Sequence, residues 1–316
     1  MTGPDGSGGP NGRNGSGGSN GSDGANGTDG TDGTDGSGQP GAQSVDGSGT
    51  ERARCVLAPN PGLMTLDGTN TWLVAEPGSP TAVVVDAGPD DEAHLRRVCA
   101  EAERLDQRIA LIVLTHGHHD HSGGARGLAA LTGAPVRAVD RGHRLGGEGL
   151  PPGAVVTDGG CEIEVIATPG HTADSVSLLL RADRAVLTGD TVLGRGTAVI
   201  ADDGNLGDYL GSLDRLRALA DSAGLRALLP GHGPLLADPV ATLDYYITHR
   251  AERLAEIRAA LAAGDRSESD IVARVYADVD RALWPFAQMS VRAQLAYLAG
   301  LGELPADMPP APDPRP

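Results

Sequence analysis

Short apolar runs alternate with stretches of helical period through the middle of the chain. Apolar residues at spacings of three and four, from Leu95 to Leu105, line one face and predict a helix. The continuous apolar run 109–114 predicts a strand that is buried on both faces. The same patterns predict strands at 71–74, 82–85, 163–167, 176–180, 185–187 and 225–229, and helices at 206–219 and 239–261.

Histidine or aspartate follows four of these predicted strands, each time beside a glycine. The four segments are Thr-His-Gly-His-His-Asp-His (115–121), Thr-Pro-Gly-His (168–171), Thr-Gly-Asp (188–190) and Pro-Gly-His (230–232). Strand ends of this kind would gather the side chains at one edge of a sheet, where ligands collect in open sheets. We therefore expect one site built from residues that are far apart in the sequence.

The candidate ligands combine imidazole and carboxylate groups, which together suit zinc, iron or manganese. His116 and His118 are two residues apart, so on an extended turn they can face the same way. Asp120 and His121 come after a bend and can reach a second position. Two metal ions that share a carboxylate would use about this number of ligands. The candidate ligands are His116, His118, Asp120, His121, His171, Asp190 and His232.

The composition of the chain limits its number of domains, its kinds of metal or disulfide site and its binding partners. A chain of 316 residues allows one large domain, or one domain and a small second one. The three cysteines (Cys55, Cys99 and Cys161) are far apart and form no Cys-x-x-Cys pair, which excludes a disulfide scaffold and a zinc site built from cysteines. All 25 basic residues are arginine, and 42 acidic residues give a net charge of −17. This charge argues against a general polyanion-binding protein, because phosphate contacts supply most nucleic-acid affinity.

The His-x-His-x-Asp-His motif, with the later Gly-His, Gly-Asp and Gly-His, resembles the signature of the metallo-β-lactamase superfamily over roughly residues 55–300. Three further stretches, 60–72, 190–197 and 246–250, are similar to the beta-lactamase-like protein 2 group. The resemblance implies an α/β fold, an αββα sandwich at 51–237, followed by a small helical, winged-helix-like domain at 238–304. A disordered Gly-rich tail at 1–50 and a Pro-rich tail at 305–316 would flank them.

The resemblance also implies a role for each candidate ligand. Two zinc ions per chain are expected, with Asp190 bridging them. His116, His118 and His171 would hold the first zinc, and Asp120, His121 and His232 the second. A hydroxide between the two ions would be the nucleophile, and Asp120 would also orient it, which makes Asp120 the candidate catalytic residue.

Three other polar residues, Asp86, His249 and Arg250, each allow two interpretations. Asp86 matches a family motif at the end of an early strand and is expected to orient a ligand rather than bind metal, but it can also be a simple turn former. His249 and Arg250 could touch an anionic substrate, or could serve helix packing and capping at the domain joint. His119 is expected to point away from the site. The histidines at 94 and 143 are expected at the solvated surface.

The substrate remains open between several classes. The resemblance implies cleavage of single-stranded RNA, but residues 51–316 carry 24 basic against 36 acidic side chains, and no basic patch is evident. Hydrolysis of a small thioester or ester, of the glyoxalase II kind, is the main alternative, with the C-terminal helices as a pocket wall. A persulfide dioxygenase with a single iron is a third, and a non-enzymatic binding module a fourth. Asp190 argues against lactam hydrolysis, because zinc β-lactamases carry Cys there or lack the bridging Asp.

The ends of the chain have no core-forming pattern. Gly recurs at every third position from Gly3 to Gly36, the period of collagen. Collagen needs Pro at roughly 15–20%, and these triplets contain only Pro4 and Pro10, so a flexible acidic tail is expected, with a marginal triple helix as the alternative. No apolar run approaches the roughly 20 residues of a membrane span, and the start lacks a signal-peptide pattern. We expect a soluble, cytoplasmic protein without a membrane partner.

Overall fold

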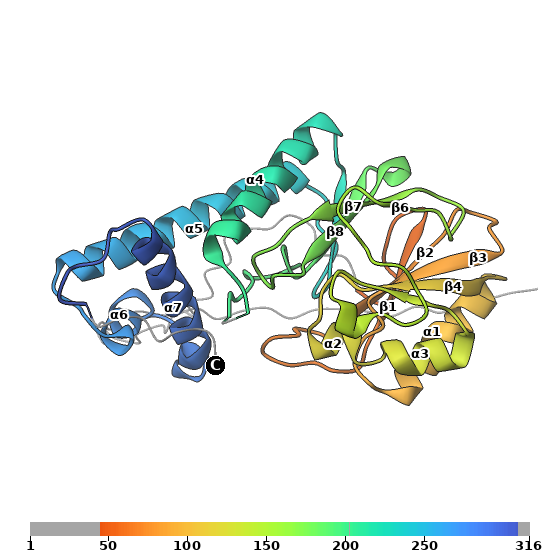
Figure 1. Ribbon diagram of the computed structural model, residues 1–316, viewed down its shortest axis with the longest axis horizontal. Coiled ribbons are helices and arrows are strands. Elements are labelled where there is room, and N and C mark those ends of the chain that lie inside the picture. The colour runs from red at the N-terminus through yellow and green to blue at the C-terminus, as the bar shows by residue number, and fades with distance from the viewer. Residues whose placement is uncertain (1–44, 202, 309–316) are drawn as a thin grey trace, which may run out of the picture. The chain divides into compact units, whose positions relative to one another are not determined.

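The computed structural model describes residues 45–201 and 203–308 (Figure 1). The expectations for the Gly repeat up to residue 44 and for residues 309–316 lie outside the described residues. Residues 45–50, the last part of the expected tail, pair with the first strand, β1 (Ala53–Leu57). The backbone N–H of Cys55 donates to Ser48 at 2.8 Å, and that of Gly47 donates to Cys55 at 3.0 Å.

The first sheet has five strands in the order β1-β2-β3-β4-β5. Strands β1 to β3 are antiparallel, and β3, β4 and β5 are parallel. The parallel pairs need crossovers, which α1 and α3 provide on the outer face of this sheet (Figure 1). The bounds are β2 (Asn70–Val74), β3 (Thr81–Val85), α1 (Glu92–Arg104), β4 (Arg108–Val113), α2 (His119–Ser122), α3 (Ala125–Thr132) and β5 (Val136–Arg137).

The second sheet also has five strands, in the order β10-β9-β8-β7-β6. Strand β8 is antiparallel to both β7 and β9, and β10 is parallel to β9. As a result β7, β9 and β10 run in one direction and end at the same edge. The bounds are β6 (Val155–Val156), β7 (Ile163–Ala167), β8 (Val176–Leu180), β9 (Ala185–Gly189) and β10 (Ala227–Pro230).

The core lies between the two sheets and on both outer faces, which confirms the αββα sandwich. Alternate residues of β3 and β4, such as Val83 and Leu111, pack against Leu178 and Leu187 of the second sheet. The neighbouring residues of the first sheet point outward and pack against α1 and α3. This alternation is the period of a strand covered on both faces. The predicted single sheet edge is therefore wrong, because the strands before the ligands belong to two sheets.

Helices α4 and α5 pack on the outer face of the second sheet, and α6 and α7 pack against these helices. Helix α4 and helix α5 run side by side, and Leu213 and Tyr246 from them share one apolar cluster with Leu228 of β10 and Val291 of α7 (Figure 1). Within the described residues 238–308 all regular structure is helical, and no helix there is long and apolar enough to cross a membrane. The bounds are α4 (Leu206–Ser222), α5 (Pro239–Ala262), α6 (Glu268–Val275) and α7 (Trp284–Gly300).

Candidate metal centre

The candidate ligands come together from the ends of strands in both sheets. The segment after β4 carries His116 and His118 and then enters α2, which holds Asp120 and His121. The second sheet contributes one residue after each of β7, β9 and β10, at its common carboxyl edge; these residues are His171, Asp190 and His232. All seven predicted ligands therefore lie in one cluster. Three overlapping sets of three residues in it have ligand atoms within 4.8 Å of one another, and the two sets that share no residue are called the first and the second group.

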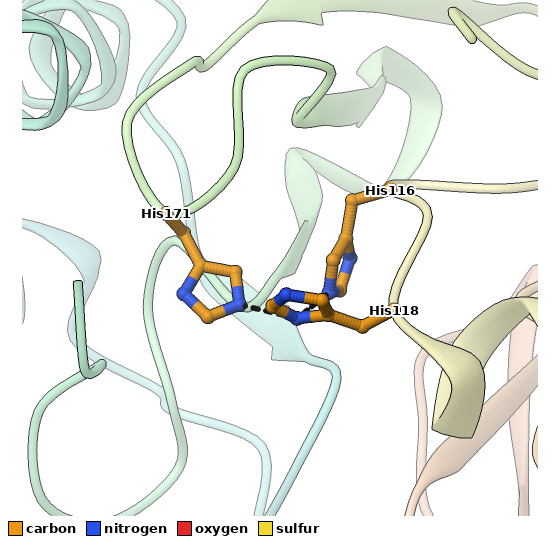
Figure 2. A group of neighbouring side chains, drawn as sticks. All are labelled: His116, His118 and His171. Atoms are coloured by element: carbon orange, nitrogen blue, oxygen red, sulfur yellow. Dashed lines mark hydrogen bonds between the residues drawn. The ribbon is translucent and has the colours of Figure 1, made fainter. Parts of the chain in front are cut away.

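Three histidines form the first group (Figure 2). Nδ1 of His118 lies 3.1 Å from Nε2 of His116 and 3.0 Å from Nε2 of His171. Figure 2 shows the three rings pointing toward one another from two separate loops. Three imidazole nitrogens that meet in this way match one face of a tetrahedral metal site.

Asp120, His121 and His232 form the second group. Nε2 of His121 and Nε2 of His232 are 3.1 Å apart, and Oδ2 of Asp120 lies 3.1 Å from the latter. Asp190 lies between the two groups. Its Oδ2 is 3.3 Å from Nε2 of His232 and 3.7 Å from Nε2 of His171, so one carboxylate is within reach of both groups.

Each of the five imidazoles has an acceptor at the nitrogen that faces away from the cluster. Thr115 gives its hydroxyl proton to Asp86 and so accepts from Nδ1 of His116 at 3.0 Å. The other four acceptors are Asp203 for His118 (2.9 Å), Asp86 for His121 (2.8 Å), the carbonyl of Val199 for His171 (2.9 Å) and the carbonyl of Gly68 for His232 (3.1 Å). With the proton assigned to the outer nitrogen, each inner nitrogen of a neutral ring carries a lone pair. These lone pairs face each other, and a cation between them would be stabilised.

Asp86 is buried, 1% exposed, and accepts hydrogen bonds from both Thr115 and His121. Its Oδ1 accepts from the backbone N–H of Thr115, and its Oδ2 accepts from the Thr115 hydroxyl and from Nδ1 of His121, all at 2.8 Å. Its φ of +59° places it in the left-handed region, which Asp tolerates better than most residues. Asp86 thus contacts a candidate ligand and faces away from the cluster.

The carboxylates of the centre stabilise positive charge, whether protonated histidines carry it or a cation that replaces their protons. Burial favours a neutral Asp190, but the positive charges of His232 and His121 outweigh burial and hold the Asp190 pKa well below its usual range. Burial also opposes the charged form of His232, yet the charge of Asp190 and a hydrogen bond to Asp120 raise its pKa to about 9. For Asp120, burial is again outweighed, here by the hydrogen bond from His232, and its pKa falls to about 2. Oδ1 of Asp190 is buried and makes no hydrogen bond within the described part of the chain.

Gly231, next to His232, leaves the space that the cluster occupies. A Cβ built on this residue would lie 2.5 Å from Oδ1 of Asp190 and 2.7 Å from Cε1 of His121. Both distances are too short for any side chain. Glycine is therefore required at position 231, because the side chains of Asp190 and His121 approach its backbone closely.

The other predicted residues lie outside the centre. Arg250 is buried, donates to the carbonyl of Ala198 and lies over the Tyr209 ring at 4.9 Å. His249 stacks on the ring of Tyr245 at a centroid distance of 5.9 Å. The contacts recorded for both residues are with residues of α4 and α5 and with a loop rather than with the candidate ligands.

Two of the remaining histidines correct the expectation of a solvated surface. His94 is buried, with its Nε2 3.0 Å from the hydroxyl of Thr71. His143 is half-buried beside Gly117, between two of the candidate ligands. His119 is exposed.

A cavity of about 310 Å³ lies beside the cluster, with His171 and Asp190 among its lining residues. Apolar side chains from 63–66, from 193–199 and from the C-terminal helices form most of the rest. Sequence reasoning missed the cavity residues and the acceptors Thr115 and Asp203. Asp203 lies before α4 with no spacing relation to the histidine motif, so no sequence signal pointed to it.

Comparisons with known proteins agree with this geometry. Residues 64–232 match the family model of the metallo-beta-lactamase superfamily, and residues 267–302 match the beta-lactamase associated winged helix domain. The chain is 35% identical over 232 residues to the beta-lactamase-like protein 2 homolog of Caenorhabditis elegans, covering 71% of this chain and 76% of that protein. The homolog of Drosophila melanogaster is 31% identical over 79% of this chain and 88% of that protein.

The fold is also similar to that of a solved structure, a metallo-beta-lactamase family protein from Thermus thermophilus. The TM-score is 0.66 at 21% identity, covering 79% of this chain and 94% of that one. The superfamily model and the Caenorhabditis elegans homolog each match more than half of the chain. The chain belongs to the metallo-beta-lactamase superfamily of hydrolases and carries the winged helix domain associated with it.

Proposed function

We propose that the protein is a hydrolase that uses two zinc ions, one held by His116, His118 and His171 and the other by Asp120, His121 and His232, with Asp190 shared between them. The orientation of the five imidazoles carries this proposal. Each ring donates a hydrogen bond from its outer nitrogen to an oxygen acceptor and turns its inner nitrogen toward the cluster. A nitrogen and oxygen donor set without thiolate suits zinc in a catalytic site.

Zinc ions at these positions would supply a nucleophile from water at neutral pH and would polarise the substrate. The protein's own residues prepare the site for that chemistry. Asp86 fixes the ring of His121, and Thr115 fixes the ring of His116. The Asp120 side chain is partly exposed at 29%, while Asp190 is at 11%, so we assign Asp120 the task of orienting the attacking water by accepting a hydrogen bond from it.

The second group of ligands favours two ions over one. A dioxygenase with a single iron would leave Asp120, His121 and His232 without a metal, although their ligand atoms lie within 4.8 Å of one another. Asp190, at 3.3 Å from the second group and 3.7 Å from the first, supports the shared position. The complete ligand set likewise favours an enzyme over a binding module.

Between the two substrate classes expected from the sequence, the cavity favours the small ester or thioester over single-stranded RNA. Apolar residues dominate the lining, and Arg195, the one arginine among the lining residues in the described part of the chain, is paired with Asp67 at 2.7 Å. RNA binding draws most of its affinity from cations on phosphate groups. RNA cleavage is therefore retained as the second candidate, supported by the resemblance alone.

The test is hydrolysis by metal-free protein before and after zinc is restored, with Asp190→Ala in parallel. A short labelled single-stranded RNA and p-nitrophenyl acetate serve as substrates. We expect zinc-dependent hydrolysis of p-nitrophenyl acetate by the parent chain and loss of most activity in Asp190→Ala. Full turnover by Asp190→Ala with two bound zinc ions would contradict the shared position of Asp190. No hydrolysis of either substrate by parent protein that holds two zinc ions would contradict the hydrolase proposal.

A further inference from the structure

We propose that the cavity beside the metal centre binds the apolar acyl group of an uncharged ester or thioester, and that this acyl group determines which substrates are hydrolysed. This inference rests on the hydrolase function proposed above. In the reaction, water adds to the carbonyl carbon and the C–O or C–S bond breaks. The products are a carboxylate, an alcohol or thiol, and a proton.

The cavity is continuous with the metal centre. His171 and Asp190, one from the first group of ligands and one shared between the groups, are both among its lining residues. A carbonyl carbon placed at the centre would therefore leave its acyl chain inside the cavity. Small-molecule sites range from about 300 to 1,000 Å³, and a cavity of about 310 Å³ is at the lower end of that range.

Three segments that are far apart in the sequence supply the apolar lining. Leu63, Met64 and Leu66 lie on one loop, and Ala198 and Val199 lie on another. The C-terminal helical region closes the cavity with a further set, which comprises Tyr276, Val279, Leu283, Phe286 and Ala287. Burial of an acyl chain against these side chains is favourable in proportion to the apolar area removed from water.

The few polar groups of the cavity carry little free charge. Arg195 donates to Asp67 at 2.7 Å, so its charge is already compensated. Thr197 and Ser290 offer hydroxyl groups only. A substrate phosphate would compete with Asp67 for Arg195, whereas an uncharged acyl chain leaves this pair intact. The charge pattern thus favours an uncharged chain.

Two side chains at the cavity are unusually exposed for their type. Leu63 is 66% exposed and Met64 is 41% exposed, and both line the cavity. Exposed apolar side chains that gather at one place mark a binding site. An acyl chain that lies against them would cover this surface.

The cavity-lining loop at 193–199 is held in place by helix α5. The hydroxyl of Tyr246 accepts from the backbone N–H of Leu193 and lies within hydrogen-bond distance of the carbonyl of Gly196, both at 2.8 Å. Arg250 donates to the carbonyl of Ala198. Because these contacts fix the loop, the cavity has a set size, and chains that exceed it should be hydrolysed more slowly.

The test measures kcat/KM of the zinc-loaded full-length protein on two series of substrates. The first series is p-nitrophenyl esters from acetate to decanoate, and the second is N-acetylcysteamine thioesters of the same acids. We expect kcat/KM to rise about fourfold for each added methylene until the cavity is full, and then to fall. Each series is judged by its own dependence on chain length, because p-nitrophenolate is a better leaving group than a thiolate.

Two matched variants test whether the cavity is responsible. Met64→Asp places a charge on a cavity side chain that is 41% exposed, and Leu131→Asp does the same on a side chain of α3 that is 44% exposed and lies outside the cavity. We expect the ratio of kcat/KM for p-nitrophenyl octanoate to that for p-nitrophenyl acetate to fall about tenfold in Met64→Asp. The same ratio should stay unchanged in Leu131→Asp. An equal fall in both variants would contradict the assignment of the cavity.

The outcomes separate this inference from the hydrolase proposal. Zinc-dependent hydrolysis of p-nitrophenyl acetate, with no dependence of kcat/KM on chain length, would overturn the inference and leave the hydrolase proposal intact. RNA cleavage without ester or thioester hydrolysis would do the same. No hydrolysis of any of these substrates by protein with two bound zinc ions would overturn both.

Discussion

Nε2 of His118 lies 2.9 Å from Oδ2 of Asp203, 85 residues further along the chain. This contact turns Nδ1 of His118 toward His116 and His171. The same loop also offers the carbonyl of Val199 to Nδ1 of His171 at 2.9 Å. One loop therefore orients two of the three histidines of the first group and also lines the cavity.

Removal of the Asp203 carboxylate should weaken the first metal site. A carboxylate that fixes a ligating histidine contributes typically 10–100-fold in metal affinity, so we expect a loss of that size in Asp203→Ala. Zinc affinity measured by competition with a chromogenic chelator checks this. Asp214→Ala, an exposed aspartate on α4, removes the same charge away from the centre and should leave both affinities unchanged. Equal losses at both sites in Asp203→Ala would count against the pairing with His118.

The two groups of ligands should respond differently to loss of His232. Nε2 of His232 faces His121 and Asp120, both in the second group. We therefore expect His232→Ala to weaken the second zinc by at least tenfold and the first zinc much less. Stepwise zinc titration followed by calorimetry separates the two affinities. If the first zinc weakens as much as the second, the assignment of His232 to the second group is wrong.

The space at Gly231 should be essential for the metal centre. An added Cβ would press on Oδ1 of Asp190 at 2.5 Å, so Gly231→Ala should displace this carboxylate and lower zinc affinity by at least tenfold.

Gly211→Ala is the matched control. Gly211 is in α4, where an added Cβ meets nothing within 4 Å. This change should leave zinc binding intact and stabilise the fold by about 0.5–1 kcal/mol, because Ala favours the helix. Unchanged zinc binding in Gly231→Ala would contradict the geometry of the centre.

The buried His94 should make the fold sensitive to acid. Burial, and then the nearby charge of Arg97, lower the pKa of His94 from 6.5 to about 4. Above pH 6.5 the ring is neutral in both the folded and unfolded states and contributes no pH dependence. As the pH falls from 6.5 to 4, the unfolded state binds the proton first, so stability is lost, by about 3 kcal/mol in total.

Urea unfolding of metal-free protein between pH 7 and pH 4 measures this loss. His94→Gln should remove most of it, so that the difference in unfolding free energy between the two proteins changes across this interval. Asp91, which accepts from the backbone N–H of His94, is unchanged in the variant. Parallel stability profiles for the parent and the variant would refute the role of His94.

The sequence identified the strands around the centre because they are buried on both faces. The run predicted at 109–114 is β4, and the strands predicted at 163–167 and 176–180 are β7 and β8 with the same bounds. The predicted strand at 225–229 begins two residues later, at Ala227, because residues 223–225 still form the end of α4 and its turn. The two-residue strands β5 and β6 were not predicted, since they are too short to show a period.

The candidate ligands were accessible to sequence reasoning for a local reason. Each follows a buried strand and has a glycine within three residues, as in the run that holds His116 and His118. The division into two sheets was not accessible from periodicity, because a strand shows the same pattern in either sheet. The residues that orient the rings come from separate loops, as Asp203 and Gly68 do, and only the folded chain brings them to His118 and His232.

The zinc content of the protein tests the central claim most directly. Protein loaded with excess zinc and freed of unbound metal by gel filtration can be measured by inductively coupled plasma mass spectrometry against protein concentration. The arrangement of His116, His118 and His171 beside Asp120, His121 and His232 predicts two zinc ions per chain, and Asp190→Ala should retain one. One zinc or none in the parent chain would contradict a centre built for two ions.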